Sequence, residues 1–233
     1  MLARYKPTAL FSLKSSATTS SGAKTLLVPT MYSVKMALVD AAFRSGGDGE
    51  SVFELVKRLE VKFKPPDHAA VTHGFIKIQR EREVKDAKNQ QAVELKRTSP
   101  FQPTVAYREF CAFDGELTVA INTEESAAWL EELLPLIGYF GKRGCFFQFV
   151  DLGTVEILPG RFTFSLDDPP EEFSLDVVVQ PLDDLGEGAT FNAINTYSSG
   201  KARLGRDRMI VQTAVPYKLE SSSRGYTLYR RAG

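Results

Sequence analysis

Two short stretches of the sequence combine glycine, hydroxyl and cationic side chains in a way that suits a phosphate-binding loop. The first covers residues 15–25 and contains Ser21, Gly22 and Lys24. Small residues let backbone N–H groups approach an anion closely, and the start of a following helix favours negative charge. The spacing is not that of a nucleotide-binding P-loop, which needs lysine directly after glycine and an immediate helix. The alternative interpretation is a surface loop before a core helix, because serine and glycine clusters usually mark loops.

The second stretch is the turn from Gly138 to Gly144, which contains Lys142 and Arg143. Its glycines permit positive φ angles and a close approach of the backbone to a ligand, and its two cations would neutralise phosphate charge. The same residue types are favoured where a helix ends and turns tightly into a strand. The two interpretations of this turn stay open on the sequence alone.

Residues for acid–base or metal chemistry are few. His68 and His73 could each act as a general base, but His73 precedes Gly74 in a strand-like run, which favours a structural role. Cys111 and Cys145 offer no zinc-site spacing with these histidines. The carboxylates between residues 167 and 187 lack the spacing of a calcium loop. We therefore expect no catalytic residue, no metal and no cofactor.

The first stretch leads into a helix over residues 31–44, where Pro29 and Thr30 supply a first-turn proline and an N-cap. The helix is apolar over most of its circumference, which is typical of a buried helix. Lys35 projects from the apolar arc near the helix start.

Hydrophobic periodicity predicts an α+β fold. In the first part we expect strands at residues 5–13, 61–64, 69–79, 104–111, 116–121 and 145–150. We expect helices at residues 31–44, 50–59 and 122–137. The tight-turn signal Asp114-Gly115 predicts that the strand at 116–121 returns beside the strand at 104–111. In outline the order is strand, helix, strand, strand, helix, strand, which is that of the ferredoxin-like fold of RNA-recognition domains. In that fold the two phosphate-binding candidates can lie near each other.

Residues 80–97 interrupt this order with a polar segment that has no core face. Its cations include Arg80, Arg82, Lys85 and Lys88. We interpret it as a protruding hairpin or arm, or as a partly disordered loop. We therefore expect a ferredoxin-like (RRM-type) domain over residues 1–152 with a thumb-like arm at about 80–100, and a β-rich C-terminal extension over residues 153–233.

The formal net charge of zero hides two charged segments. No lysine or arginine lies between Arg161 and Lys201, whereas cations dominate from Lys201 onward. This distribution suits one anionic partner and neighbouring proteins, although solvated faces explain it equally well. No run approaches the roughly 20 apolar residues of a membrane span, and two free thiols suit a reducing compartment. We expect a cytoplasmic protein with no membrane partner.

Three stretches together resemble the CRISPR-associated protein 5 family, the RAMP-type subunit of type I Cascade complexes. They are the Ser/Thr-Gly loop leading into a Pro-Thr helix start (20–44), the basic excursion before an Arg-Glu-Phe strand (80–110), and the strand Glu116–Ile121 followed by a helix and the Gly-Lys-Arg-Gly turn. They cover most of residues 1–150, and the β-rich tail matches only loosely.

The resemblance implies a non-catalytic subunit that binds the repeat-derived 5′ handle of a CRISPR RNA (crRNA). It also implies contacts with the adjacent backbone subunit and with the large subunit, and an arm that folds over the guide. Contact with target DNA near the protospacer-adjacent motif is left open. Carried onto this chain, the handle site comprises Ser21, Gly22, Lys24, Lys35, Lys142 and Arg143, with Arg80, Arg82, Lys85 and Lys88 on the arm. Phosphate, 2′-OH and base-stacking contacts would supply affinity.

One branch of this family cleaves the precursor RNA with a tyrosine and an adjacent lysine–histidine pair. This sequence has no Lys-His dipeptide, since Asp67 precedes His68 and Thr72 precedes His73. Two alternatives remain: a metal-independent endoribonuclease that uses His73 or Tyr32, and a structural adaptor whose acidic 167–187 segment docks a basic protein.

Overall fold

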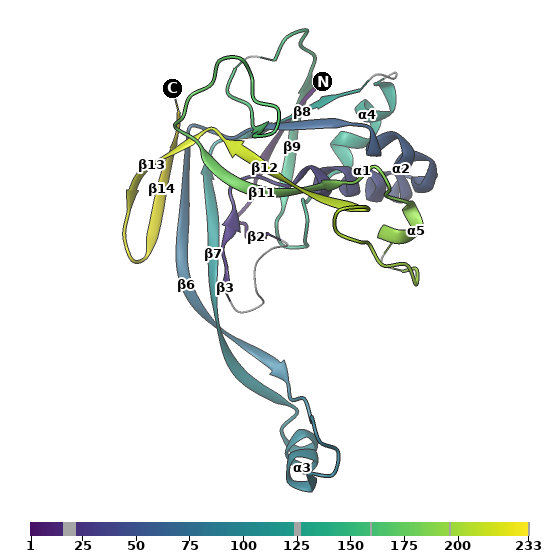
Figure 1. Cartoon of the computed structure of the whole chain (residues 1–233), viewed down its shortest axis with the longest axis vertical. Helices are drawn as coiled ribbons and strands as arrows, with labels where there is room; N and C mark the ends of the chain where they lie inside the picture. Colours follow the sequence, from purple (N-terminus) through teal and green to yellow (C-terminus); the bar gives the residue numbers. More distant parts are fainter. Residues whose placement is uncertain (16–21, 124–126, 159, 196, 233) are drawn as a thin grey trace.

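The computed structural model describes residues 1–15, 22–123, 127–158, 160–195 and 197–232, and it has the predicted α+β architecture. Figure 1 shows a globular body from which one long hairpin projects, with a helix at its far end. No helix in the described part of the chain is long and apolar enough to cross a membrane.

The first sheet is built from four antiparallel strands in the order β5-β8-β1-β9. Their bounds are β1 (Leu2–Pro7), β5 (Glu60–Lys64), β8 (Leu117–Asn122) and β9 (Phe147–Gly153). Helices α1 (Met31–Arg44) and α2 (Gly49–Lys57) lie between β1 and β5 in sequence. Helix α4 (Ala128–Leu133) and the 3₁₀ turn η1 (Leu134–Leu136) lie between β8 and β9. Buried Tyr5 ties β1 to this helical layer, because its hydroxyl donates to the Leu134 carbonyl at 2.9 Å.

The first strand is shorter than predicted. It ends at Pro7 rather than at Leu13, since the chain then leaves the sheet and Thr8 donates its N–H to the Phe146 carbonyl. Leu13 instead begins a two-stranded ladder of β2 (Leu13–Lys14) and β4 (Thr25–Leu26). The predicted cap of α1 is correct: the Thr30 side chain accepts from the Ser33 N–H at 3.1 Å.

The second sheet has the order β13-β14-β6-β7-β3. Its strands are β3 (Gly22–Ala23), β6 (His68–Glu81), β7 (Phe101–Asp114), β13 (Tyr217–Ser222) and β14 (Tyr226–Arg231). β6 and β7 pair over their whole length, from His68 opposite Asp114 to Glu81 opposite Phe101. Beyond their neighbours β14 and β3, these two strands leave the body as a ribbon that carries α3 (Gln90–Thr98) at its tip (Figure 1).

The predicted hairpin across Asp114-Gly115 is wrong. The turn exists, with Gly115 at φ +130°, but β7 pairs with β6 whereas β8 pairs with β1 and β5. The chain changes sheets at this point. A side chain on Gly115 would also lie 3.1 Å from the Pro66 Cβ, so both the backbone angle and the space require glycine.

The C-terminal part adds a three-stranded antiparallel sheet in the order β10-β12-β11, together with a short helix. The bounds are β10 (Phe164–Ser165), β11 (Val178–Leu185), α5 (Phe191–Ile194) and β12 (Arg208–Val215). β11 packs on α1, and its Leu182 and Leu185 belong to the same buried cluster as Ala3 and Tyr5. Side chains from both sides of residue 152 therefore share one core.

A buried ion pair fastens this C-terminal sheet to α1. Lys35 is only 2 % exposed, and its Nζ lies 2.7 Å from the Asp184 Oδ1. Burial raises the pKa of the Asp184 carboxyl, and the Lys35 ammonium opposes that rise. Because the desolvation of two charges costs several kcal/mol, the pair stabilises the fold only while both members are present.

We expect Asp184→Ala to lower the free energy of unfolding by about 3 kcal/mol, since it leaves Lys35 charged and buried without a counter-ion. Urea denaturation of the purified variant measures this. Asp176→Ala is the matched control, because Asp176 pairs with Lys218 at the surface and such pairs contribute about 1 kcal/mol or less. Equal small decreases in the two variants would contradict the assigned role of the buried pair.

Candidate functional site

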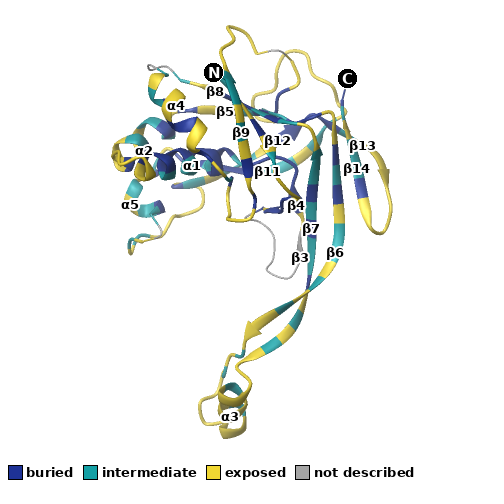
Figure 2. Cartoon of the chain, turned by 180° about the vertical axis from the view of Figure 1, so that it is seen from behind, coloured by how far each residue is buried: buried dark blue, intermediate teal, exposed yellow. Residues whose placement is uncertain are grey.

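The arm formed by β6, α3 and β7 exposes aromatic and aliphatic side chains that nothing in the described chain covers. Phe75 is 75 % exposed, Val105 62 % and Phe101 58 %. Phe75 lies directly across the ladder from Tyr107, and the two rings meet edge to face at 5.5 Å between centroids. Figure 2 shows that the arm is exposed along most of its length. Such rings offer flat faces on which bases can stack.

Three of the four predicted arm cations are exposed and available. Arg80, Lys85 and Lys88 make no ion pair among the described residues. Arg82 instead has a structural role, because its Nε donates to the Ser99 carbonyl at 2.8 Å and closes the ribbon below the tip helix. The other two cations of residues 80–97 are neutralised, since Lys96 pairs with Glu81 and Arg97 with Glu94, both at 2.9 Å.

The first phosphate-binding candidate reaches the base of the arm. Ser21 lies outside the described residues. Gly22 is in β3 and pairs in parallel with β7 opposite Tyr107, and Lys24 is exposed. The structure therefore brings Gly22 and Lys24 beside the exposed aromatic pair of the arm.

The second candidate lies near the start of the same loop. Gly141 and Gly144 adopt positive φ angles of +75° and +97°. A Cβ on Gly141 would lie 3.2 Å from the Leu13 Cδ2 and 3.9 Å from the Ser33 Cβ, so the turn packs against β2 and the first turn of α1. Lys142 and Arg143 are both exposed on this turn. The turn therefore lies beside Leu13, two residues before the first stretch begins.

Lys35 is not part of this surface. The resemblance to the CRISPR-associated protein 5 family placed Lys35 in the handle site, but in the structure its side chain faces Asp184 of the C-terminal sheet. A lysine that is 2 % exposed and already neutralised cannot reach a phosphate. The residues available for the site are consequently those of the loop, the turn and the arm.

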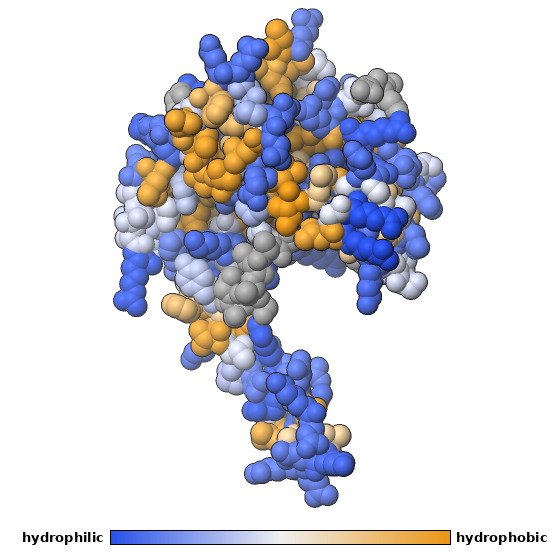
Figure 3. Space-filling model, in the orientation of Figure 1, coloured by the Kyte–Doolittle hydropathy of each residue, from blue (hydrophilic) through white to orange (hydrophobic). Residues whose placement is uncertain are grey.

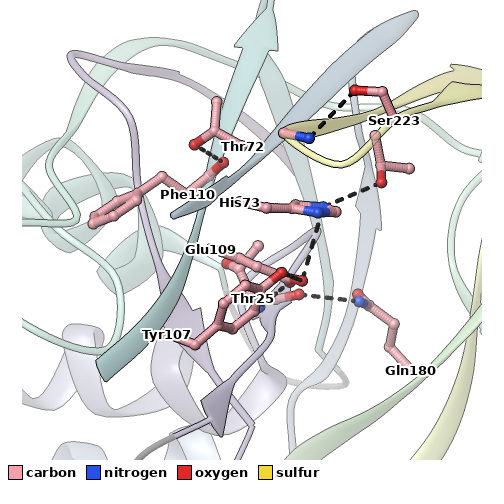
Figure 4. Close-up of polar contacts among 10 residues, drawn as sticks. Thr25, Thr72, His73, Tyr107, Glu109, Phe110, Gln180 and Ser223 are labelled. Carbon is pink, nitrogen blue, oxygen red and sulfur yellow. Dashed lines mark hydrogen bonds and ion pairs between the residues drawn. The ribbon is translucent and has the colours of Figure 1, made fainter. Parts of the chain in front are cut away.

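Sequence reasoning missed a polar cluster at the base of the arm. His73 and Glu109 are register partners on β6 and β7, and the His73 Nε2 lies 3.9 Å from the Glu109 Oε1. The Tyr107 hydroxyl lies 3.3 Å from the same carboxylate, and Thr227 Oγ1 lies 3.2 Å from the His73 Nε2. Burial raises the pKa of the Tyr107 phenol, and the negative charge of Glu109 raises it further. Figure 4 shows these side chains gathered together.

Glu109 also holds the returning end of the loop. This carboxylate is 7 % exposed and accepts the Thr25 backbone N–H at 2.9 Å. From the other side, the Gln180 amide donates to the Thr25 carbonyl at 3.4 Å and accepts from the Leu27 N–H at 2.8 Å (Figure 4). Arm, loop and C-terminal sheet are therefore joined at Thr25. The acid positions the loop and does not face an anionic ligand.

The two residues named for a ribonuclease have different surroundings. Tyr32 lies beneath the Arg208 guanidinium, 4.4 Å from its ring centroid, and burial raises the pKa of its phenol. His73 instead contacts Thr227, Glu109 and Tyr107. His68 is exposed at the start of β6. The side chains that surround His73 are therefore those of Thr227, Glu109 and Tyr107 rather than that of Tyr32. Only the register of β6 against β7 and β14, which the sequence does not give, reveals them.

No protein-family model matches the chain. The chain is similar to a protein named CRISPR-associated protein Cas5 from Archaeoglobus fulgidus, with 23 % identity over 184 residues that cover 76 % of this chain and 75 % of that protein. The resemblance to the CRISPR-associated protein 5 family is thereby confirmed. A crystal structure of a CRISPR protein from Archaeoglobus fulgidus aligns with 100 % of this chain and 91 % of its own, at 13 % identity and a TM-score of 0.48. At that TM-score the likeness supports no conclusion.

We expect Glu109→Ala to lower the free energy of unfolding by about 1–3 kcal/mol, because the buried Thr25 N–H loses its acceptor. Amide exchange at Thr25, followed by NMR, should accelerate in the same variant. Glu109→Gln is the control, since its amide oxygen can still accept from Thr25. If the alanine and glutamine variants unfold and exchange alike, Glu109 does not hold the loop.

Proposed function

We propose, on the basis of the chain's similarity to a CRISPR-associated protein Cas5, that it is a non-catalytic RNA-binding subunit of a type I CRISPR interference (Cascade) complex. In this role it binds the 5′ handle of crRNA and joins the backbone and large subunits. The similarity supports the assignment to a CRISPR effector complex. The arm supports the RNA-binding part of the proposal.

The observation that carries the proposal is the composition of the arm surface. Arg80, Lys85 and Lys88 present positive charge without a counter-ion in the described chain, and Phe75 presents an aromatic ring to solvent. Phosphates pair with such cations, and bases of a single strand stack on such rings. A ribbon with both features suits a single-stranded RNA segment such as a 5′ handle.

The first sheet supports the same assignment by its topology. Four antiparallel strands lie in the order β5-β8-β1-β9, with helices after the first and third of them in sequence. This arrangement supports the proposal of a ferredoxin-like unit. The hairpin β6–β7 is inserted between its second and third strands. We propose that this insertion is the thumb-like arm of the subunit.

The RNA does not bind on the sheet face that RNA-recognition domains use. Those domains carry aromatic side chains on the outer face of their two central strands. Here the corresponding residues of β1 are Leu2, Arg4 and Lys6, opposite the buried Ala3 and Tyr5. Arg4 is already neutralised by Asp151 and Glu116. This favours the arm, with the loop and the glycine turn at its base, as the RNA-binding surface.

The tip of the arm suits contact with a neighbouring protein subunit. α3 has no buried residue, and its Val93 and Leu95 are 44 % and 46 % exposed. Apolar side chains gathered at the end of a projection are covered when a partner docks there. We assign this contact to the adjacent backbone subunit.

We expect Arg80→Gln with Lys85→Gln to weaken retention of crRNA by the complex, and Lys142→Gln with Arg143→Gln to do the same, because each pair neutralises phosphates. The slope of log K against log salt should fall by about 0.7 for each phosphate that is no longer neutralised. Co-purification of the complex at increasing salt, with quantitation of the bound RNA, measures both effects.

The matched control is Lys96→Gln with Arg97→Gln, which removes the same charge from the same arm at positions that are already paired with Glu81 and Glu94. Its retention of RNA should stay close to that of the unaltered chain. Unchanged retention in the Arg80/Lys85 and Lys142/Arg143 variants would overturn the proposal. If RNA retention falls equally in the control, the loss reflects the total charge of the chain and not a specific RNA contact.

A metal-independent endoribonuclease is the second candidate, and the polar cluster favours it. The Glu109 carboxylate lies 3.9 Å from the His73 Nε2, and a histidine beside a carboxylate is a common arrangement for a general base. His73 could take the proton of a ribose 2′-OH as this oxygen attacks the adjacent phosphate. The attack forms a 2′,3′-cyclic phosphate and breaks the bond to the 5′-oxygen of the next nucleotide, which leaves with a proton from water. The His73 side chain is 21 % exposed, which leaves limited access from the arm surface.

If this second function holds, the purified chain should cleave labelled precursor crRNA in the presence of EDTA, and His73→Ala should abolish cleavage. His68→Ala is the control, because His68 lies outside the cluster and should leave the rate unchanged. A chain that binds the precursor without cleaving it is a binding subunit only.

A further inference from the structure

A second cationic surface lies far along the chain from the arm, in the loop at residues 197–206 between α5 and β12. It carries Lys201, Arg203 and Arg206, all exposed. Lys201 and Arg203 make no ion pair among the described residues, and Arg206 approaches only Asp207, at 3.8 Å. Tyr197 is 98 % exposed. None of these residues contributes to the loop, turn and arm described above.

The shape of this loop is fixed by a buried acid. Asp207 is 2 % exposed, and its carboxylate accepts the Arg203 N–H at 2.8 Å. In return the Asp207 N–H donates to the Arg203 carbonyl at 2.9 Å, and Gly205 adopts a φ of +85° between them. The carboxylate thus organises the backbone and leaves the guanidinium of Arg203 to project outward.

Close backbone packing holds the loop against its neighbours. A Cβ on Gly186 would lie 2.0 Å from the Arg206 carbonyl oxygen, and one on Gly188 would lie 2.8 Å from the Arg206 Cγ. At the other end, a Cβ on Gly200 would lie 2.3 Å from the Asn192 carbonyl oxygen of α5. No side chain fits at these three glycines, so the loop is built to one geometry. The backbone that carries its cations is therefore already ordered, which lowers the entropic cost of binding.

The chemistry of the loop favours a nucleic acid over a protein as its ligand. The carboxylates of an acidic protein would pair with the cations, but they would not stack on the Tyr197 ring. A single strand satisfies both, since its phosphates pair with lysine and arginine while a base stacks on an exposed ring. Figure 3 shows hydrophilic side chains concentrated where Figure 1 places α5 and the start of β12, away from the arm.

We propose that residues 197–206 form a second binding site, which takes a single-stranded nucleic acid segment. Tyr197 stacks on a base, and Lys201, Arg203 and Arg206 contact the phosphates on either side of it. The proposal rests on the geometry of this loop and not on the handle assignment. The bound strand is an RNA or a displaced DNA strand, which share phosphate and base chemistry.

The test is fluorescence anisotropy of the full chain with an unstructured single-stranded RNA, the same sequence as single-stranded DNA, and a DNA duplex, each over a range of salt. We expect Tyr197→Ala to weaken single-strand binding roughly tenfold, as removal of one stacked base would, whereas Tyr197→Phe retains it. Lys201→Gln with Arg203→Gln should lower the salt slope by about 1.4. The control is Lys57→Gln with Arg224→Gln, which removes the same charge elsewhere.

A second readout is photocrosslinking with a thiouridine- or thiothymidine-substituted strand, followed by peptide mapping. Crosslinks to the peptide that spans 197–206 support the site, and the preferred strand tells RNA from DNA. The proposal is overturned if the Tyr197 and Lys201/Arg203 variants bind like the control and no crosslink maps to the loop. A preferential decrease in duplex binding would overturn it too. The arm variants are measured separately from the Tyr197 and Lys201/Arg203 variants. If nucleic-acid binding decreases in only one of these two sets, the residues of the other set do not form a binding site.

Discussion

The antiparallel ladder between β6 and β7 sets the shape of the molecule, because it runs from the core out to the tip of the arm. Its first residues are part of the core, where Val71 and Cys111 are buried opposite each other. Beyond Phe75 the same two strands have no third strand and no helix against them in the described chain. An isolated two-stranded ribbon is marginally stable in water. Here it persists because it continues a ladder that is anchored in the core and is closed near its tip by Arg82.

The anchor at the base of this ladder decides where the neighbouring loops lie. Glu109 sits on β7 at the level of His73, and its carboxylate holds Thr25 at the point where the loop returns to the body. Gln180 holds the same residue from the C-terminal sheet. A buried carboxylate with a backbone donor is stabilising only when its partners are in place, so arm, loop and sheet are ordered together.

Some acidic residues of the segment at 167–187 form ion pairs within the fold. Asp184 neutralises buried Lys35, and Asp183 pairs with Arg208, which in turn covers the Tyr32 ring. These two acids fasten the C-terminal sheet to α1 and are not available to an external partner. Cations without an ion pair among the described residues include Arg80, Lys85 and Lys88 on the arm, Lys142 and Arg143 on the glycine turn, and Lys201 and Arg203 on the loop at 197–206. A chain of zero formal charge thus presents separate basic surfaces.

The local features of this protein could be predicted from the amino-acid sequence alone: the cap at Thr30, the apolar helix that follows, the turn at Gly115, and the polar excursion that became the arm. The same is true of the resemblance to the CRISPR-associated protein 5 family. These depend on neighbouring residues, whose propensities and periodicity can be read directly. Arg80, Lys85 and Lys88 were placed correctly on the surface for the same reason.

Contacts between residues far apart in the chain depend on tertiary packing, and no local sequence pattern specifies them. From the sequence, Lys35 could be a surface cation, but in the structure it pairs with Asp184. His73 has no partner nearby in the sequence, but the register of β6 against β7 places Glu109 beside it. The strand after Gly115 belongs to the first sheet, where its apolar face is buried. The turn signal at Asp114-Gly115 does not predict which sheet this strand joins. Ion-pair partners, strand register and sheet membership follow from packing between segments far apart in the chain, and no local pattern specifies them.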